Sequence, residues 1–283
     1  MQRQIIAGVT GSRADFGIQK PVLDAILAEP GFVLDLYVTG MHLSSRFGNT
    51  VEEVEAVGFE IAGRIDCETT GGSHEEVALS TSAGMAGFTK AWSLKRPDLV
   101  LLLGDRFETF AAASAAYLLN IPIAHIAGGD VTSGSLDDGL RHAISKFSSL
   151  HFTTNEEASA RLVRMGEDPA TVHTTGTPAL DSIRSLELLS RDEVERRVGA
   201  PTDHVSLVTY ANADSGGAAL NQALVEAAAR SPRIIARESL GQLLYLSALR
   251  HASMVVGNSS SGLYEAPSFS IPTINIGTRQ DGR

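Results

Sequence analysis

The chain has 283 residues, of which 43% are hydrophobic, and this composition is typical of a globular protein with one large or two modest cores. A formal net charge of −10 disfavours nucleic acid or a membrane surface as a partner, because either would require clustered Lys and Arg. The single cysteine, Cys67, excludes an internal disulfide and fits a reducing compartment, and no apolar segment is long enough for a signal peptide or a membrane span, so we expect a cytoplasmic protein.

Short apolar runs alternate along the chain with stretches of helical period, and this alternation predicts an α/β fold with parallel sheets. The runs are apolar throughout rather than at every second residue, so we expect helices to cover both faces of each sheet. We divide the chain into two such units, residues 1–177 and 178–283, with a hinge within residues 174–203. The eight expected strands are residues 4–10, 32–40, 98–104, 121–129, 204–210, 232–236, 253–258 and 271–277.

Glycine-rich polar clusters follow four of the expected strands. In open α/β sheets, ligands bind where the carboxyl ends of the strands meet the starts of the helices. Four clusters at the same end of two sheets therefore predict one shared cleft between the units. The clusters are GSRAD at residues 11–15, GDR at 104–106, GGD at 128–130 and NSSSG at 258–262.

The serine turn, residues 259–261, follows a buried apolar run and precedes a short helix that we expect to open at Gly262. The free N–H groups of a helix start and the small side chains suit an anion such as a diphosphate. An alternative is that Ser261 simply caps the helix. With Ser261 as the cap, Glu265 lies one residue too far along for a capping box, and its carboxylate is then available to accept hydrogen bonds from both hydroxyls of a ribose.

Carboxylates stand in several of the loops that follow strands. Asp105 and Asp130 come after apolar runs, and the glycines beside them allow close approach to a ligand. Asp137 and Asp138 open the next expected helix. For each of these acids, capping of the following helix is an alternative role.

Residues 137–149 predict a helix with one apolar and one polar face. We expect Asp137 and Arg141 to pair on its flank. The polar face either contributes to a site or is exposed to solvent, where an ion pair stabilises little. The apolar face carries Leu140, Ile144 and Phe147, and the polar face carries Asp138, His142 and Ser145.

His125 lies inside an apolar run and is expected to be a core histidine with satisfied hydrogen bonds. The chain has eight histidines and one cysteine, but they form no HExxH pattern, and Cys67 has no partner thiol. We therefore expect neither a metal nor a cofactor.

Seven motifs run through nearly the whole chain: GSRADFG (11–17), LLLGDRFETFAAASAAYLLNIPIAHIAGGD (101–130), GSLDDGLRHAISK (134–146), TTGTPALDSI (174–183), ANADSGG (211–217), GNSSSGLYEAPSF (257–269) and PTINIGTRQDGR (272–283). In content and order they resemble the hydrolysing UDP-N-acetylglucosamine 2-epimerases, most closely the bacterial branch of sialic-acid and legionaminic-acid biosynthesis. The resemblance implies two Rossmann-like domains facing a cleft, as in the GT-B glycosyltransferases, with a UDP-sugar bound between them. We also expect a homo-oligomer, either a dimer or a tetramer.

The resemblance also implies roles for individual residues. Ser259, Ser260 and Arg279 are expected to hold the diphosphate, Glu265 the ribose, and Tyr245 to stack near the uracil. The expected catalytic residues are Asp105, Asp130, Asp137 and His142. Further substrate contacts are expected from Arg13, Asp15, Arg106, Arg141, Gly176 and Asn212.

The implied reaction is an elimination followed by a hydration. C2 of the sugar has no carbonyl, so its proton is only weakly acidic, and departure of UDP must develop positive charge on the ring before or as the proton leaves. The resulting 2-acetamidoglucal then adds water with inversion at C2. Both steps need an acid and a base, which carboxylates in different environments can supply. The implied products are UDP and a free N-acetylmannosamine-type sugar.

The chain departs from the family pattern at several places. Ala127 stands where many members have a catalytic glutamate, and Asp130 is expected to take over its role, while Ile18 replaces a lysine. After Tyr210, a helix, a strand and a substrate-contacting histidine have no counterpart, and GTRQDGR precedes helices that family members normally have. We expect the intact protein to be longer.

Two other functions fit parts of the pattern. A GT-B glycosyltransferase shares the nucleotide half and turns over only with an acceptor, whereas a non-catalytic UDP-sugar binding protein binds without releasing UDP. The loops GDR and LDDGLRH favour the epimerase. Its substrate is expected to be UDP-N-acetylglucosamine or a 2,4-diacetamido-trideoxy relative.

Overall fold

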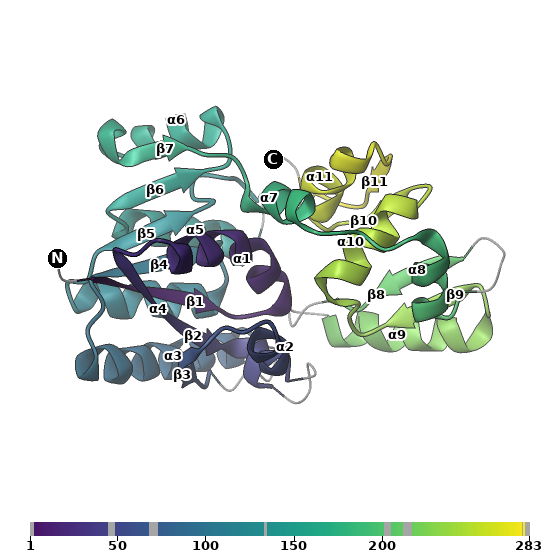
Figure 1. Cartoon of the computed structure of the whole chain (residues 1–283), viewed down its shortest axis with the longest axis horizontal. Helices are drawn as coiled ribbons and strands as arrows, with labels where there is room; N and C mark the ends of the chain where they lie inside the picture. Colours follow the sequence, from purple (N-terminus) through teal and green to yellow (C-terminus); the bar gives the residue numbers. More distant parts are fainter. Residues whose placement is uncertain are drawn as a thin grey trace.

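A seven-stranded parallel sheet forms the centre of the first half of the chain in the computed structural model (Figure 1). The strand order is β3-β2-β1-β4-β5-β6-β7, with the change of direction between β1 and β4 that is typical of Rossmann-like folds. The structure describes residues 3–44, 49–67, 73–132, 135–200, 205–211, 217–278 and 280. The strands are β1 (Gln4–Thr10), β2 (Phe32–Thr39), β3 (Ile61–Ile65), β4 (Leu99–Leu103), β5 (Ile123–Ile126), β6 (Leu150–Thr153) and β7 (Val172–Thr174).

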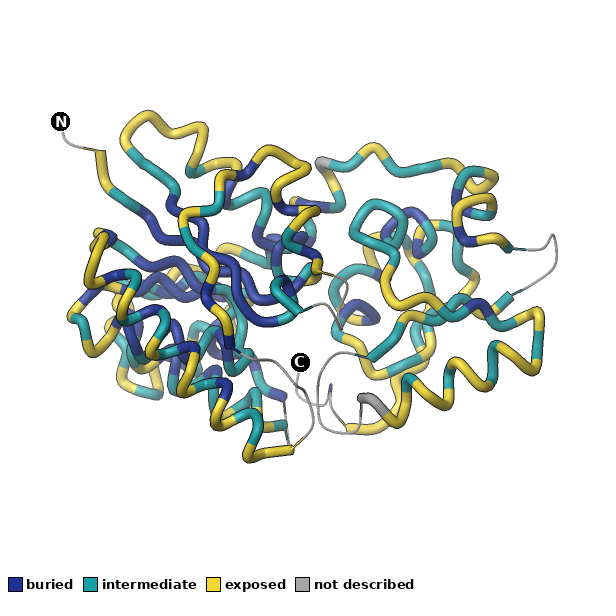
Figure 2. The backbone as a smooth tube through the Cα atoms, turned by 90° about the horizontal axis from the view of Figure 1, so that it is seen from below, coloured by how far each residue is buried: buried dark blue, intermediate teal, exposed yellow. Residues whose placement is uncertain are grey.

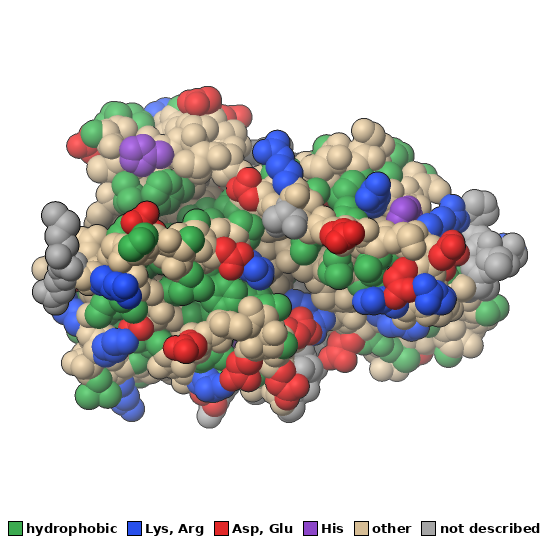
Figure 3. Space-filling model, in the orientation of Figure 1, with side chains coloured by type: hydrophobic (Ala, Val, Ile, Leu, Met, Phe, Trp, Pro, Cys, Tyr) green, Lys and Arg blue, Asp and Glu red, His purple; other side chains and the backbone are tan. Residues whose placement is uncertain are grey.

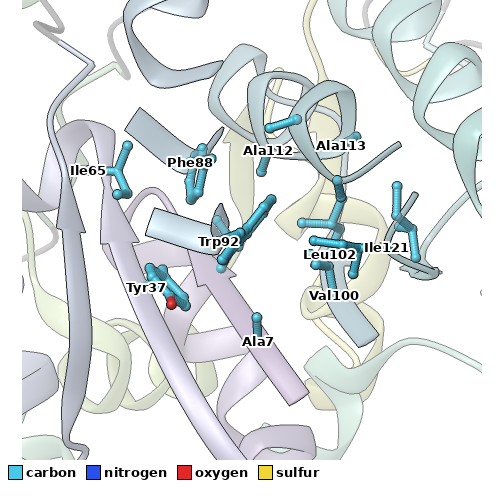
Figure 4. Packing of buried hydrophobic residues seen from close by; sticks show 14 of the residues in the cluster. Ala7, Tyr37, Ile65, Phe88, Trp92, Val100, Leu102, Ala112, Ala113 and Ile121 are labelled. Carbon is cyan, nitrogen blue, oxygen red and sulfur yellow. The ribbon is translucent and has the colours of Figure 1, made fainter. Parts of the chain in front are cut away.

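Helices cover both faces of this sheet, and buried residues concentrate between the layers (Figure 2). On one face Trp92 lies beside Phe88, with ring centroids 4.9 Å apart, above the strands (Figure 4). The buried alanines within residues 111–116 let helix α4 lie close to the sheet, because their side chains are small. The helices are α1 (Arg13–Ala28), α2 (Val51–Ala56), α3 (His74–Leu94), α4 (Phe107–Leu118), α5 (Leu136–Phe147) and α6 (Glu156–Arg164).

The second half forms a smaller lobe in which the strands make two separate parallel pairs. β8 pairs with β9 and β10 with β11, and within the described residues no strand joins the two pairs. The expected two-lobed α/β fold is therefore confirmed. The elements are α7 (Pro178–Ser185), α8 (Arg191–Val198), β8 (Ser206–Thr209), α9 (Gly217–Arg230), β9 (Ile234–Arg237), α10 (Gly241–His251), β10 (Val255–Gly257), α11 (Ser261–Tyr264) and β11 (Thr273–Asn275).

The two lobes meet at a carbonyl of helix α1. The backbone oxygen of Gly17 accepts a hydrogen bond from Ser182 Oγ of α7 at 2.8 Å and another from Gln242 Nε2 of α10 at 2.6 Å. A Cβ atom at residue 17 would lie 3.0 Å from Gln242 Cδ, so glycine permits this close approach. The contact lies beside the expected hinge, and the domain division between residues 177 and 178 stays a prediction.

All eight expected strands are confirmed, with bounds that differ by a few residues. The sequence pattern does not predict β3, β6 and β7, because glycine or polar residues interrupt their apolar runs. Among the described residues, no helix combines the length and the apolar character needed to cross a membrane. On the face shown in Figure 3, basic and acidic side chains are interspersed, so this face has no single sign of charge.

Two histidines are completely buried and hydrogen-bonded in the first lobe. His125 of β5 contacts Gly104 O at 2.8 Å and Ser145 Oγ at 3.1 Å, which confirms the expected core histidine. His42 contacts two threonine hydroxyls at 3.1 and 2.8 Å. Burial lowers the pKa of each histidine from 6.5 to about 4.

We predict that the free energy of unfolding falls as the pH drops below 6.5, because the unfolded chain then binds protons at His42 and His125 while the folded chain keeps both neutral down to about pH 4. Each histidine removes about 2 kcal/mol of stability by pH 5. Urea denaturation at pH 7.5 and pH 5 measures this loss. The difference between the two pH values should be smaller for His125→Asn than for the wild type, and an equal difference would contradict the prediction.

Candidate functional site

The first polar cluster lies where β1, which runs toward the second lobe in Figure 1, leads into α1. Ser12 caps this helix, since its Oγ accepts from the N–H of Asp15 at 3.3 Å and donates to Asp15 Oδ2 at 2.7 Å. Burial raises the pKa of the Asp15 carboxyl, the positive charge of Arg106 opposes this rise, and the negative charge of Asp137 adds to it. The clusters after β1 and β4 and at the start of α5 are therefore close together.

Arg141 of α5 organises this end of the sheet. Only 2% of Arg141 is exposed, and its guanidinium donates to the carboxylate of Asp105, to Thr132 Oγ1 at 2.8 Å and to the backbone oxygen of Asp130 at 2.9 Å. It also lies 3.5 Å from Asp138 Oδ1. One buried cation therefore fixes the loops after β4 and β5 relative to each other.

This arrangement corrects the expected faces of α5. The sequence places Arg141 on the flank of the helix, but its side chain is almost fully buried and pairs with Asp105 and Asp138, while its pairing with Asp137 stays a prediction. Ser145 is fully buried, so the alternative of a solvent-exposed polar face is wrong for this residue. The physical reason is that α5 covers the polar loops at the strand ends, where carbonyls and carboxylates bond to buried polar side chains.

Asp130 follows the Gly-Gly turn after β5 and is 8% exposed. Its Oδ1 accepts a hydrogen bond from Thr154 Oγ1 at 2.7 Å, and its Oδ2 accepts one from the hydroxyl of Tyr264 at 3.0 Å. The turn requires glycine at residue 129, where φ is +82° and a Cβ atom would lie 2.5 Å from Ala158 O. Because Tyr264 belongs to the second lobe, the lobes meet at this carboxylate.

Glu108 is a site residue that the sequence does not single out. Its side chain is 1% exposed and pairs with Arg106 through two contacts of 3.2 Å, Nε to Oε2 and Nη2 to Oε1. Burial raises the pKa of the Glu108 carboxyl, and the charge of Arg106 opposes this rise. Gly40 leaves room for the Glu108 side chain, since a Cβ atom at residue 40 would lie 2.6 Å from Glu108 Oε1. The sequence feature that could have indicated Glu108 is its place as an acid in the first turn of the helix that follows GDR.

Two further predicted residues lie around this cluster. Arg13 donates to Glu53 of α2 and to Ser239 of the second lobe, so it also spans the two lobes. His142 Nε2 lies 3.8 Å from Asp138 Oδ2, and burial lowers the pKa of the imidazole. In the part of the chain that the structure describes, no group of three or more His, Cys, Asp or Glu side chains is placed to hold a metal ion.

The serine turn leads into α11, which has four residues. One expectation is wrong, and one alternative is excluded. The helix begins at Ser261 rather than at Gly262, and Ser261 does not cap it, because the cap position is occupied by Ser260, whose side chain makes no capping bond. Ser261 Oγ instead bonds to the hydroxyl of Tyr245. Since a single turn has a small dipole, an anion at this position depends on individual N–H groups.

Glu265 follows α11 and is half-buried. Burial raises the pKa of its carboxyl, and a hydrogen bond with Ser261 opposes this rise. Burial also raises the pKa of the Tyr245 phenol. Tyr245, Ser261 and Glu265 thus form a chain of polar groups inside the second lobe. The backbone at Gly176 has a φ of +83°, with open space where a side chain would be. The predicted residues Asn212 and Arg279 lie outside the described residues.

Comparison with known proteins identifies the family to which this site belongs. Residues 24–210 and 197–283 match the family model described as UDP-N-acetylglucosamine 2-epimerase. The chain belongs to the UDP-N-acetylglucosamine 2-epimerase family. As an epimerase of this family, it has the α/β fold and the order of motifs that the sequence predicts.

Individual members of the epimerase family match over nearly the whole chain. The UDP-N,N'-diacetylbacillosamine 2-epimerase (hydrolyzing) of Legionella pneumophila is 35% identical, and the alignment covers 100% of this chain and 83% of the relative. The UDP-N-acetylglucosamine 2-epimerase of Neisseria meningitidis serogroup B is 34% identical over 97% of this chain and 80% of the relative. The crystal structure of UDP-GlcNAc 2-epimerase from Neisseria meningitidis bound to UDP-GlcNAc has a TM-score of 0.79 at 18% identity, over 98% of this chain and 84% of that chain, which shows a shared fold.

The Legionella epimerase has residues without a counterpart here, because the alignment extends over 316 positions and the chain has 283 residues. The family model matches in two stretches whose overlap ends at Tyr210, where the absent helix and strand are expected. The two unconnected strand pairs of the second lobe agree with such an absence.

Arg141→Met is predicted to destabilise the fold by roughly 3–5 kcal/mol, because it removes a buried cation that bonds to the Asp105 carboxylate and the Asp130 carbonyl. Urea denaturation at pH 7 measures the loss. Arg191→Met is the control, since this arginine pairs with Glu195 on the surface and its side chain is 67% exposed. The control should leave the midpoint unchanged, and equal effects of the two substitutions would contradict the organising role of Arg141.

Proposed function

We propose that the protein is a hydrolysing 2-epimerase, which converts a UDP-linked 2-acetamido sugar into UDP and the free sugar inverted at C2. The observation that supports this proposal most directly is the contact between the lobes at the site. Arg141 connects Asp105 to Asp130, and Asp130 accepts a hydrogen bond from Tyr264, the neighbour of Glu265. Acids of the first lobe are thus adjacent to the segment expected to bind the nucleotide, as an enzyme acting on the sugar of a nucleotide requires.

The nucleotide is proposed to bind to the second lobe. Ser259 and Ser260 hold the diphosphate together with the backbone N–H groups at the start of α11. The carboxylate of Glu265 accepts hydrogen bonds from the ribose hydroxyls. Tyr245 lies near the uracil, where its bond to Ser261 fixes the phenol. Remaining contacts are assigned by motif position to Asn212, Arg279 and Gly176.

The sugar is proposed to lie against the acids of the first lobe. As UDP leaves, the C1–O bond breaks and its electron pair stays with the diphosphate, while a carboxylate takes the C2 proton and the C1=C2 double bond forms. Asp130 suits this role of base, because hydroxyl donors on both of its oxygens fix the orientation of the carboxylate. Arg13 and Arg106 provide positive charge to stabilise the leaving diphosphate.

In the second step, water adds to C1 of the 2-acetamidoglucal, and C2 receives a proton on the face opposite the one that lost it. A base takes a proton from the water and an acid supplies the proton to C2. We assign these tasks to Asp105 and Asp137, with His142 beside them on α5, because carboxyl groups in different environments can divide acid and base roles. Asp15 and Arg141 complete the polar surroundings of the sugar.

The substrate class is proposed from the relatives. The Legionella relative is described as a UDP-N,N'-diacetylbacillosamine 2-epimerase (hydrolyzing), and the Neisseria relative as a UDP-N-acetylglucosamine 2-epimerase. The motif resemblance supports a place in sialic-acid or legionaminic-acid biosynthesis. The rates of UDP release from purified UDP-N-acetylglucosamine and from purified UDP-N,N'-diacetylbacillosamine decide which of the two sugar nucleotides is the substrate. The homo-oligomer and the cytoplasmic location stay predictions.

Turnover in deuterated water is predicted to place deuterium on C2 of the released sugar, because the hydration step delivers a solvent-derived proton to that carbon. Mass spectrometry of the sugar and an assay for UDP measure both products. UDP release without label at C2 would show simple hydrolysis and reject the epimerase. Release that requires an added acceptor would indicate a glycosyltransferase, and binding without release would indicate a non-catalytic protein.

Asp130→Asn is predicted to lower kcat by about 10²- to 10⁴-fold, because the amide cannot take a proton. The Kd for UDP should change by less than about threefold, since the serine turn is untouched. Glu60→Gln, at an exposed position between α2 and β3, removes the same charge and is the control. Steady-state kinetics and calorimetry with UDP provide the two readouts. A kcat for Asp130→Asn equal to that of the control would exclude Asp130 as the base.

A further inference from the structure

The hydroxyl of Tyr264 joins the segment after the serine turn to an acid of the other lobe. Tyr264 is the last residue of α11 and precedes Glu265, and its hydroxyl donates to Asp130 Oδ2 at 3.0 Å. The other oxygen of Asp130 accepts from Thr154 Oγ1 at 2.7 Å. Thr154 follows β6 in the first lobe, so the two hydroxyl donors of this carboxylate come from different lobes.

This pair of donors defines the plane of the Asp130 carboxylate. An ionised carboxylate only accepts hydrogen bonds, and a carboxylate with one donor can still rotate about its Cβ–Cγ bond, whereas a donor on each oxygen fixes the plane. Asp130 is 8% exposed, so water has little access to replace either donor. The backbone of the same residue is already fixed, because Arg141 donates to its carbonyl at 2.9 Å. The remaining freedom of Asp130 is thus removed by Thr154 and Tyr264.

We propose that Tyr264 is a positioning residue for Asp130, and that it makes the orientation of the base depend on the nucleotide-binding segment of the other lobe. This inference rests on the proposed function. The nucleotide contacts assigned to Ser259, Ser260 and Glu265 belong to the same short segment as Tyr264. When this segment is docked on the first lobe, the base is aligned at the same moment as the nucleotide is held. When the lobes separate, Asp130 keeps only the donor from its own lobe.

Tyr264 is one of several residues that connect the lobes. Gln242 Nε2 and Ser182 Oγ bond to Gly17 O at the hinge, and Arg13 bonds to Ser239. The loss of one phenolic hydroxyl should therefore leave the association of the lobes intact. Removing this hydroxyl therefore separates a positioning role of Tyr264 from a purely structural role, because the two roles predict different changes in kcat and KM.

The test compares Tyr264→Phe with the wild type in UDP release and in C2 deuterium incorporation. We expect kcat to fall about 10- to 100-fold, as for loss of a hydrogen bond to a charged group. The KM for the sugar nucleotide and the Kd for UDP should change less than about threefold, because the aromatic ring and the serine turn remain. Thr154→Val, which removes the donor on the other oxygen, should lower kcat in the same way. An unchanged kcat, or a loss confined to KM, overturns the proposal.

Two further variants separate positioning from a general effect on the fold. In the double variant Asp130→Asn with Tyr264→Phe, the second substitution should cause no further loss, because it acts only through Asp130, and a multiplicative loss overturns the proposal. Gln242→Met removes another hydrogen bond between the lobes, at the hinge, and should leave kcat unchanged. Urea denaturation of every variant shows whether it is folded at the assay temperature.

The same assay distinguishes failure of this inference from failure of the proposed function. A wild-type protein that releases no C2-labelled sugar from any UDP-linked 2-acetamido sugar overturns the function and the inference together. A wild type that releases labelled sugar, with a Tyr264→Phe variant of equal kcat, overturns the inference alone.

Discussion

The buried guanidinium of Arg141 fixes the geometry on which the rest of the site depends. A charge removed from water costs several kcal/mol unless its donors find acceptors, and here a carboxylate, a carbonyl and a hydroxyl surround it. These acceptors come from the loops after β4 and β5, so the loops cannot move independently of α5. The acids at the strand ends are therefore oriented before a ligand arrives, which is what electrostatic preorganisation requires.

The two lobes contribute in different ways to this site. The first lobe has a seven-stranded sheet with two layers of core, and its acids stand on loops held by that framework. The second lobe has smaller clusters and carries the polar chain of Tyr245, Ser261 and Glu265. The proposed division, with chemistry on the larger lobe and nucleotide binding on the smaller one, fits a reaction in which the bond between sugar and nucleotide is broken. The hydrogen bond of Tyr264 to Asp130 joins the two lobes at the point where these proposed tasks meet.

Much of the fold can be predicted from the sequence, because parallel strands covered on both faces give continuous apolar runs and because their ends carry the polar loops. The strands β3, β6 and β7 cannot be predicted in this way, because glycine or polar residues interrupt their apolar runs. In the site, the positions of Asp105 and Asp130 follow from the strand ends. The inward direction of Arg141 does not, because helical periodicity describes an apolar face and this helix covers polar loops.

Contacts between distant segments are harder still to predict. Tyr264 and Asp130 lie 134 positions apart, and their hydrogen bond depends on how two lobes dock, for which no local pattern exists. Glu108 is similarly hard to predict, because an acid in the first turn of a helix usually lies at the surface and interacts favourably with the helix dipole. Only the packing around Gly40 shows that the Glu108 side chain is buried. The close approach of α11 to Thr273 of β11 also depends on packing, because only a glycine at residue 262 leaves room for it.

The strand pairs of the second lobe have a consequence for the behaviour of the protein at high concentration. Within the described residues, each pair leaves strand edges without a ladder partner, and such edges can recruit a strand from another molecule. The pairs β8–β9 and β10–β11 are only four and three residues long, so each edge presents few N–H and C=O groups to an incoming chain. Such short edges offer few hydrogen-bonding groups from which an intermolecular β-sheet could form.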